Sequence, residues 1–292
     1  MARKSDWIIG GLLGGGVLVI VVVMALLIAG PMLSSDSSFS GAGGGRIALV
    51  EVRGPITRAE DTVKQLIKYR EDESVRAIVL RIESPGGAVA PTQEIFDELR
   101  KTREADKIIV ASMGSVAASG GYYIACAADS IVANPGTITG SIGVITVAPS
   151  AEDLFEKIGI DWQVVKSGRH KDIGSMSRGM TDEELGIVQS VVDDVYDQFV
   201  GAVASYRPLS REEVVEVADG RIYTGNQALP LGLVDRLGTY QDAIALAGKM
   251  AGLPEKPSVV RQPPKTFFEM LMENMETMTD LYSPGIVEYR YR

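Results

Sequence analysis

The chain has 292 residues, of which 46% are hydrophobic and 23% charged, enough to form a sizeable domain with a buried core. Its formal net charge of −9 offers no basic stripe for phosphate groups and argues against a nucleic-acid partner. A single cysteine, Cys126, excludes an intrachain disulfide, and a single histidine, His170, leaves no Cys or His pair at metal-ligand spacing. We therefore expect neither a metal site nor another cofactor.

The N-terminal run from residue 7 to residue 30 has no charged side chain and predicts a transmembrane helix. At ~1.5 Å per residue it reaches about 36 Å, more than the ~30 Å hydrocarbon core of a bilayer. A cleaved signal peptide is the alternative, because Arg3 and Lys4 resemble its basic start. The run is longer than the ~7–15 apolar residues of such a peptide, which favours an uncleaved anchor.

The charges beside this run predict its orientation. Arg3 and Lys4 precede it, and no further basic residue occurs before Arg46. The positive-inside rule therefore places residues 1–6 in the cytoplasm and everything after the helix on the other side of the membrane. We expect a single-pass protein of the cytoplasmic (inner) membrane, held in lipid by residues 7–30, with its folded domain on the extracytoplasmic side.

The pattern beyond the anchor is that of an α/β domain. Residues 31–45 are rich in serine and glycine and predict a flexible linker. Short apolar runs then predict buried strands at 46–52, 77–82, 108–113, 131–133 and 162–166, with helices expected at 60–70, 91–104 and 150–158 and a loop at 134–143. Strands that alternate with helices indicate a largely parallel sheet with flanking helices.

Three later helix starts carry capping boxes, in which a Ser or Thr is followed three residues on by Glu or Gln. They are Thr181 with Glu184, Ser210 with Glu213, and Thr224 with Gln227. We expect the domain to span residues 46–254. Residues 255–292 change in character and are assigned to a C-terminal extension, whose Met-rich part at 266–281 is typical of packing or subunit contact.

One serine in the sequence "GSVAASGGYYIACAAD" lies among small residues at the expected start of a helix. On its own, Ser119 in this setting is more often a packing residue than a nucleophile. Acyl transfer also needs N–H donors for the developing oxyanion, and Gly120 supplies one candidate. The other is Gly86 or Gly87 in "SPGG", which follows a neighbouring strand, so parallel strands would gather these residues in one crevice.

Two residues compete for the role of general base, and the residues alone leave the choice open. His170 and Lys171 are adjacent in the polar loop "SGRHKDIGS". A lysine amine has an ordinary pKa of ~10.4 and must lose its charge to accept a proton, which requires desolvation. A lysine flanked by glycine and serine is ordinarily solvated, so composition slightly favours His170.

Five blocks of this sequence together resemble the bacterial signal peptide peptidase family of serine proteases. They are "SPGG" (84–87), "AASGGYYIACAAD" (117–129), "GSIGV" (140–144), "KSGRHKDIGS" (166–175) and "GRIYTGNQALPLGLVDRLG" (220–238). The blocks occur in order over residues 46–250. The resemblance implies a Clp protease/crotonase-like fold and catalysis by a Ser/Lys dyad.

The same resemblance assigns roles to individual residues. It implies that Ser119 is the nucleophile, that Lys171 is the general base and that Ser141 holds the lysine amine in place. Gly120 and the pair Gly86 and Gly87 align with the oxyanion donors, and His170 becomes an ordinary loop residue. The chain has one repeat and resembles the short form of the family, which is oligomeric; we expect a homo-oligomeric ring whose active sites are shared between neighbours.

The expected function is a membrane-anchored serine endopeptidase that degrades remnant signal peptides and similar apolar peptides. One alternative is a membrane-bound Clp-class protease with a different membrane-protein substrate. Another is a catalytically idle assembly or binding protein of the same fold, against which the complete set of Ser119, Lys171 and Ser141 speaks. A crotonase-like acyl-CoA enzyme is disfavoured, because the anchor would keep the domain away from cytoplasmic acyl-CoA.

Overall fold

The computed structural model describes residues 45–262 and 288–290. The predicted transmembrane helix (7–30), the linker up to residue 44 and the Met-rich segment (266–281) lie outside the described residues. Within the described ranges, no helix is both long enough and apolar enough to cross a bilayer. Membrane anchoring therefore stays a prediction.

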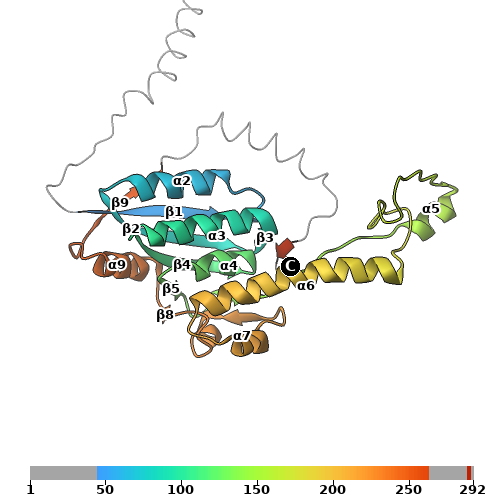
Figure 1. Ribbon diagram of the computed structural model, residues 1–292. Helices are drawn as coiled ribbons and strands as arrows, with labels where there is room; N and C mark the ends of the chain where they lie inside the picture. The colour runs from blue at the N-terminus through green and yellow to red at the C-terminus, as the bar shows by residue number, and fades with distance from the viewer. Residues whose placement is uncertain (1–44, 263–287, 291–292) are drawn as a thin grey trace, which may run out of the picture. The chain divides into compact units, whose positions relative to one another are not determined.

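An eight-stranded, mostly parallel sheet forms the centre of the domain (Figure 1). Six strands follow the order β7-β6-β4-β2-β1-β9, while β5 pairs with β4 and β8. Every pair is parallel except β6 with β7. The strands are β1 (Arg46–Arg53), β2 (Val75–Ser84), β4 (Ile108–Ala118), β5 (Ser130–Ala133), β6 (Ile138–Gly140), β7 (Ile222–Thr224), β8 (Arg236–Leu237) and β9 (Ser258–Arg261).

In a separate two-stranded sheet, β3 (Gly86–Ala88) pairs with β10 (Glu288–Arg290), a strand close to the C-terminus of the chain. The helices of the domain are α2 (Glu60–Glu71), α3 (Val89–Glu104), α4 (Gly120–Cys126), α5 (Glu152–Ile158), α6 (Asp182–Tyr206), α7 (Arg211–Val217), α8 (Gly225–Ala228) and α9 (Tyr240–Met250). All three predicted capping boxes are present, at the starts of α6, α7 and α8.

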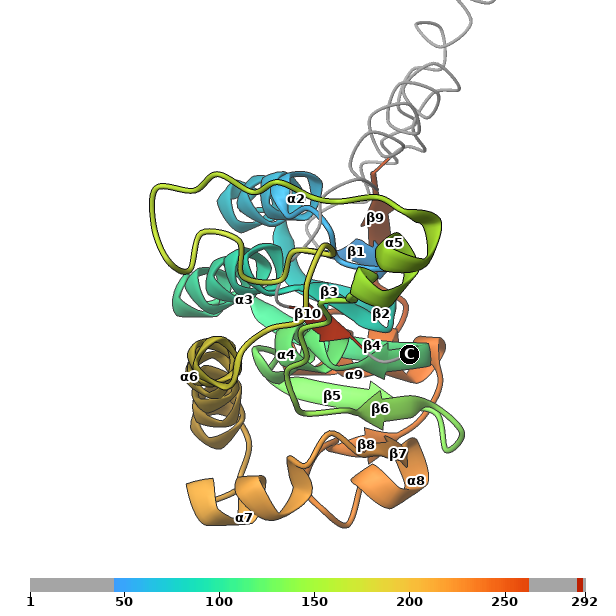
Figure 2. The ribbon, with the colours of Figure 1, turned by 90° about the vertical axis from the view of Figure 1, so that its right-hand side faces the viewer.

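Both faces of the sheet are buried, which explains why its strands are nearly continuous apolar runs. Ile47 and Leu49 of β1 pack in a cluster with Ala243 and Ala247 of α9, whereas Ala48 faces the larger core on the other side. Figure 2 shows α2, α3 and α6 along this second side. The alternation follows from the period of two along a strand. The predicted α/β architecture is confirmed.

Three local expectations differ from the structure. Residues 162–166 form no strand, because "WQVVK" does not reach the sheet and all of its side chains are exposed. The expected loop at 134–143 contains β6, whose residues pair with the end of β4. The segment assigned to the C-terminal extension contributes β9, which pairs with β1 and so extends the sheet.

Residues 145–180, which we call the arm, contain no buried residue. The arm includes α5 and leads into the N-terminal end of α6, to one side of the sheet (Figure 1). It carries many of the large hydrophobic side chains that are exposed in the described part of the chain: Ile145, Val147, Leu154, Ile158, Ile160, Trp162, Val164, Val165 and Met176. Val165 is fully exposed, which is unusual for so apolar a side chain.

Candidate active site

The carboxyl ends of three neighbouring parallel strands meet at one edge of the sheet. Ser84 at the end of β2 lies opposite Ala117 of β4, and Ala118 at the end of β4 lies opposite Gly140 at the end of β6. The chain leaves these strands at Pro85, Ser119 and Ser141. The sequence prediction that "SPGG" and Ser119 share one edge therefore matches the backbone register.

Ser119 has a backbone conformation that side chains rarely adopt. Its φ is 53° and its ψ is −119°, at the turn between β4 and α4. Its N–H donates to the Gly140 carbonyl at 2.8 Å, and its carbonyl accepts from the Tyr123 N–H at 2.8 Å. These bonds fix a sharp strand-to-helix turn, the geometry by which a nucleophilic serine is held out at the end of a sheet.

This strain leads to a stability prediction. A left-handed backbone costs an L-residue of order 1–3 kcal/mol, and glycine escapes most of that cost. Glycine also makes the unfolded chain more flexible, which offsets part of this gain. The net expectation is that the free energy of unfolding of Ser119→Gly exceeds that of Ser119→Ala by about 1 kcal/mol. Chemical unfolding of both variants measures the difference.

The control is Ser115 on β4, whose φ is not positive. There the order should reverse, with Ser115→Ala more stable than Ser115→Gly. Equal stability of the two variants at position 119 would mean that the turn is not strained.

The glycines on either side of the crevice are in close contact. A Cβ atom built on Gly120 would lie 3.2 Å from the Cα of Gly86 and 3.3 Å from the nitrogen of Gly87. A Cβ on Gly121 would lie 2.8 Å from the Ser84 carbonyl oxygen. Larger residues would push α4 away from the turn between β2 and β3, so small residues are required here for packing as well as for chemistry.

The hydrogen bonds of this turn distinguish between its two candidate oxyanion donors. The N–H of Gly86 donates to the Ser84 hydroxyl at 3.2 Å, so it is already used within the turn. The nitrogen of Gly87 lies against Gly120, the residue directly after Ser119. Gly87 and Gly120 therefore form the better placed pair of N–H donors.

The side chain of Ser119 is isolated within the described part of the chain. The residue is 1% exposed, and its Oγ has no hydrogen-bond partner there. Neither Lys171 nor Ser141 of the same chain is hydrogen-bonded to it. The nucleophile candidate and its expected base are thus not joined within one chain.

Ser141 follows β6 beside Ser119 and is 7% exposed, with a φ of 51°. It lines a cavity of about 450 Å³ between the end of β6 and α6. Asp193 and Asp219 line the same cavity, which gives it an acidic wall. Hydrogen bonds from Arg221 hold the pKa of the Asp219 carboxyl at about 2, so this carboxylate is charged at neutral pH.

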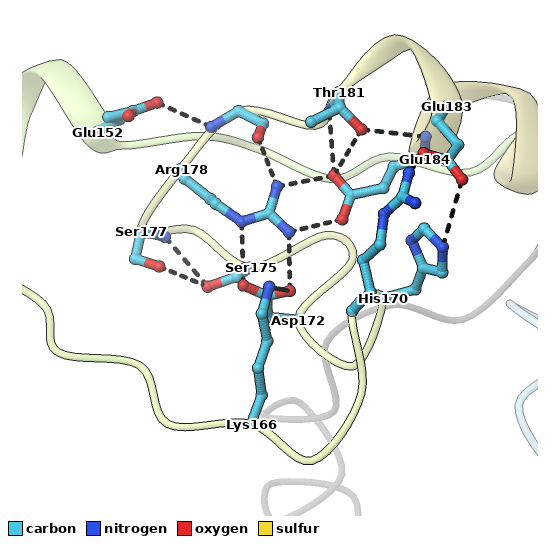
Figure 3. A network of polar contacts seen from close by, with 12 residues as sticks. Glu152, Lys166, His170, Asp172, Ser175, Ser177, Arg178, Thr181, Glu183 and Glu184 are labelled. Atoms are coloured by element: carbon cyan, nitrogen blue, oxygen red, sulfur yellow. Dashed lines mark hydrogen bonds and ion pairs between the residues drawn. The ribbon is translucent and has the colours of Figure 1, made fainter.

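Lys171 is an exposed residue of the arm, and its neighbours His170 and Asp172 belong to the network of polar contacts in Figure 3. The carboxylate of the next residue, Asp172, accepts hydrogen bonds from Lys166 Nζ at 2.5 Å and from Arg178 at 2.7 and 3.0 Å. These bonds hold the pKa of Asp172 well below its usual range. The turn that presents Lys171 is therefore tied to Arg178.

Arg178 connects this turn to the start of α6. Its guanidinium also donates to the two carboxylate oxygens of Glu184 at 2.6 and 2.7 Å. Glu184 is buried and completes the capping box with Thr181, and the Arg178 hydrogen bonds lower its pKa to about 2. The charged hydrogen bonds from Arg178 to Asp172 and to Glu184 therefore connect the Lys171 turn to the long helix α6.

His170 lies beside Lys171 but faces another partner. Its Nε2 is 3.6 Å from a carboxylate oxygen of Glu183 on α6, and its Nδ1 is buried without a hydrogen bond in the described part of the chain. Among the residues that the structure describes, no group of three or more His, Cys, Asp or Glu side chains could hold a metal ion. Cys126 is buried in the core, as expected for a small packing residue, and burial raises the pKa of its thiol to about 12.

Sequence reasoning missed the network around Arg178. The signal available was a Thr-x-x-Glu capping box preceded by an arginine, but nothing in the sequence pairs that arginine with Asp172. It likewise missed a fourth capping box, Thr239 with Asp242, at the start of α9.

Comparison with known proteins gives concordant matches. The profile of peptidase family S49 matches residues 101–254, and that of Clp protease matches residues 46–136. A putative protease of Synechocystis is 46% identical over 241 residues, covering 80% of this chain and 87% of that protein. A putative signal peptide peptidase of Enterococcus faecium is 41% identical, covering 63% of this chain and 54% of that protein. Protease 4 of Salmonella typhi is 37% identical, and the match covers 80% of this chain but 39% of that longer protein.

Proposed function

The chain belongs to peptidase family S49, a family of serine proteases, and on that premise we propose that it is a membrane-anchored endopeptidase that cleaves remnant signal peptides and similar apolar peptides. The observation that carries this proposal is the crevice at the strand ends. There a serine in a strained turn stands between two glycines whose N–H groups can receive an oxyanion.

The proposed reaction is acyl transfer by a Ser/Lys dyad. Ser119 Oγ attacks the scissile carbonyl while neutral Lys171 takes the hydroxyl proton, and Gly87 and Gly120 stabilise the oxyanion. The protonated lysine then returns the proton to the leaving amine, and water repeats the cycle on the acyl-enzyme. Ser141 would orient the lysine amine.

We further propose that the lysine comes from a neighbouring copy of the chain in a closed ring. Two observations support this: the Ser119 Oγ has no hydrogen-bond partner in the part of the chain that the structure describes, and Lys171 is exposed on an arm that lacks a buried residue. The exposed apolar residues of the arm, including Trp162 and Val165, are of the kind that a subunit contact covers.

The acidic cavity beside Ser141 is the proposed entry for that lysine. The turn to be received carries Lys171 and the cavity wall carries Asp193, so these two charges are complementary, while Arg169 and Asp219 are already paired with Glu183 and Arg221. Desolvation of the lysine amine favours its neutral form, whereas the cavity carboxylates favour its protonated form, so the amine must lie beyond these carboxylates, at Ser119, to act as a base. A solvated monomer should then be inactive.

The dyad is tested by separating the two candidate bases. His170→Ala should keep most peptidase activity, whereas Lys171→Ala should lose nearly all of it, because only the lysine is expected to accept the serine proton. The pH–rate profile should rise into the alkaline range, above the ~6.5 of an ordinary histidine. An acid limb near 6.5 that disappears in His170→Ala would instead identify the histidine as the base.

The location of the domain is a separate proposal, supported by the apolar run at 7–30 and the basic residues Arg3 and Lys4. Protease added to spheroplasts should digest the domain beyond residue 45, whereas protease added to inside-out vesicles should not reach it. A cytoplasmic marker protein serves as the control for membrane integrity. Digestion in inside-out vesicles alone would reverse the orientation.

A further inference from the structure

The guanidinium group of Arg178 uses every donor that it has. Nε and Nη2 donate to the two carboxylate oxygens of Asp172 at 3.0 and 2.7 Å, and Nη1 and Nη2 donate to those of Glu184 at 2.7 and 2.6 Å (Figure 3). The fifth N–H donates to the Gly179 carbonyl at 2.9 Å. Because the five N–H groups lie in one plane, they hold the two carboxylates in a fixed relative orientation. One of these carboxylates directly follows Lys171 in the chain.

Other contacts between this turn and α6 end on the carboxylate of Glu183. Arg169 pairs with it, and His170 Nε2 lies 3.6 Å from one of its oxygens. The side chains of Arg169 and Glu183 are 70% and 49% exposed, and ion pairs in such a setting contribute little because water screens them. The side chains of Asp172 and Glu184, by contrast, are 11% and 4% exposed. The guanidinium contacts are therefore the stronger connection.

The connection continues from Glu184 into the core of the domain. Glu184 belongs to the first turn of α6, where it forms the capping box with Thr181. Farther along the same helix, Phe199 and Val203 are fully buried. The arm has no buried residue of its own, so its turn can take a fixed position only through contacts with an element that is packed on the domain. The continuous helix α6 is such an element.

We propose that Arg178 is a positioning residue of the peptidase: it fixes the Lys171 turn on α6 and thereby sets where the lysine amine lies relative to the serine that it serves. This inference rests on the proposed function for the role of Lys171. In a ring with shared sites, Arg178 acts on the site that its chain completes for a neighbour, not on the site around its own Ser119. Its bonds hold the pKa values of Asp172 and Glu184 below their usual range, so both carboxylates stay charged at the neutral and alkaline pH at which the lysine would act.

Arg178→Lys and Arg178→Met, each in the full-length protein, test this role. Lysine keeps the charge but cannot donate to both oxygens of two carboxylates, and methionine keeps neither property. Misplacement of a reacting group by ~1 Å can cost about 10² in rate. We therefore expect kcat to fall about tenfold in Arg178→Lys and about a hundredfold in Arg178→Met. KM for a short apolar peptide should not change, because the guanidinium is engaged with the protein alone.

Arg100→Met on α3 is the matched control. The Arg100 guanidinium also donates to two carboxylates, those of Asp97 and Glu104, but it lies outside the arm. This variant should keep the wild-type kcat and KM. A wild-type kcat in Arg178→Met would overturn the proposal, and so would an equal loss of kcat in Arg100→Met.

Mixed rings separate a positioning role from a general loss of structure. Arg178→Met mixed 1:1 with Ser119→Ala should reach about a quarter of the wild-type activity, because one contact in four joins an intact serine to a correctly held lysine. Mixed with Lys171→Ala it should gain nothing, since neither chain supplies such a lysine. A variant with a damaged fold would be restored by neither partner. Failure of Ser119→Ala to restore Arg178→Met, while it restores Lys171→Ala, would therefore overturn the proposal.

Hydrogen exchange keeps this inference separate from the proposed function. Three amides of the turn, those of Lys171, Ile173 and Ser175, donate to carbonyls three residues earlier. They should exchange faster in Arg178→Met and at the wild-type rate in Arg100→Met, while the amides of α4 exchange alike in all these proteins. If the wild type neither hydrolyses peptides nor reacts with a fluorophosphonate, the peptidase function fails. If Ser119→Ala does not restore Lys171→Ala, the shared site fails. In both cases unchanged exchange in Arg178→Met would still contradict the role of Arg178, and faster exchange would support it.

Discussion

Ser119→Ala is expected to abolish both peptide hydrolysis and labelling by a fluorophosphonate probe while leaving the fold intact. The substitution removes the only atom proposed to attack the scissile carbonyl, and loss of a nucleophile costs a serine protease on the order of 10⁴–10⁶ in kcat. The fold should survive because Oγ makes no hydrogen bond in the described part of the chain. Loss of an unsatisfied buried oxygen carries little energetic penalty.

The matched control is Ser115→Ala, on the same strand four residues earlier. Ser115 is exposed and lies within β4, not in the turn that follows the strand. This variant should hydrolyse peptides and react with the probe at wild-type rates, and both variants should unfold at similar temperatures. Persistent labelling of Ser119→Ala would show that the nucleophile is another residue.

Mixing Ser119→Ala chains with Lys171→Ala chains should restore activity that neither variant has alone. If each site combines the serine of one chain with the lysine of its neighbour, some contacts in a mixed ring bring together two intact residues. In a 1:1 mixture with random assembly, one contact in four does so, and activity should return to about a quarter of the wild-type value. The measurement is peptidase activity of reassembled rings whose composition is confirmed by native mass spectrometry.

A second mixture, in which one component is the active wild type, also distinguishes sites shared between two chains from sites built by one chain. Wild type mixed 1:1 with the double variant Ser119→Ala/Lys171→Ala should have about a quarter of the wild-type activity if sites are shared. It should have about a half if each chain builds its own site. Mixed rings of the two single variants that stay inactive, together with the value of one half, would refute sharing.

The arrangement of helices and strands was largely predictable because it depends on local periodicity. Both faces of the sheet are buried, so β1, β2 and β4 are apolar runs that stand out in the sequence. Capping boxes such as Thr181 with Glu184 act between residues three apart, and for this reason the sequence located them correctly. The strand predicted at 162–166 is wrong for a related reason. An apolar run that pairs with no other strand has the same local sequence pattern as one that does.

The candidate site was predictable only in part. Ser119 and the two glycines after it could be singled out because close packing of a buried turn requires small residues, which the sequence displays directly. The choice between His170 and Lys171 could not be made from composition, because it depends on which side chain loses water in the assembled site. The family resemblance, rather than any local pattern, assigned that role to Lys171.

The α/β class, the small-residue crevice and the helix starts could be predicted because they follow from contacts and spacings within a few residues. Long-range contacts showed that the Gly86 amide is bonded within its own turn while the Gly87 nitrogen lies against Gly120. They also showed that the Ser119 hydroxyl has no hydrogen-bond partner among the described residues and that Arg178 ties the Lys171 turn to α6. The tertiary structure also placed β10 against β3, although the two lie near opposite ends of the domain sequence. Such contacts join residues far apart in the chain, and their geometry arises only when the sheet register brings those residues together.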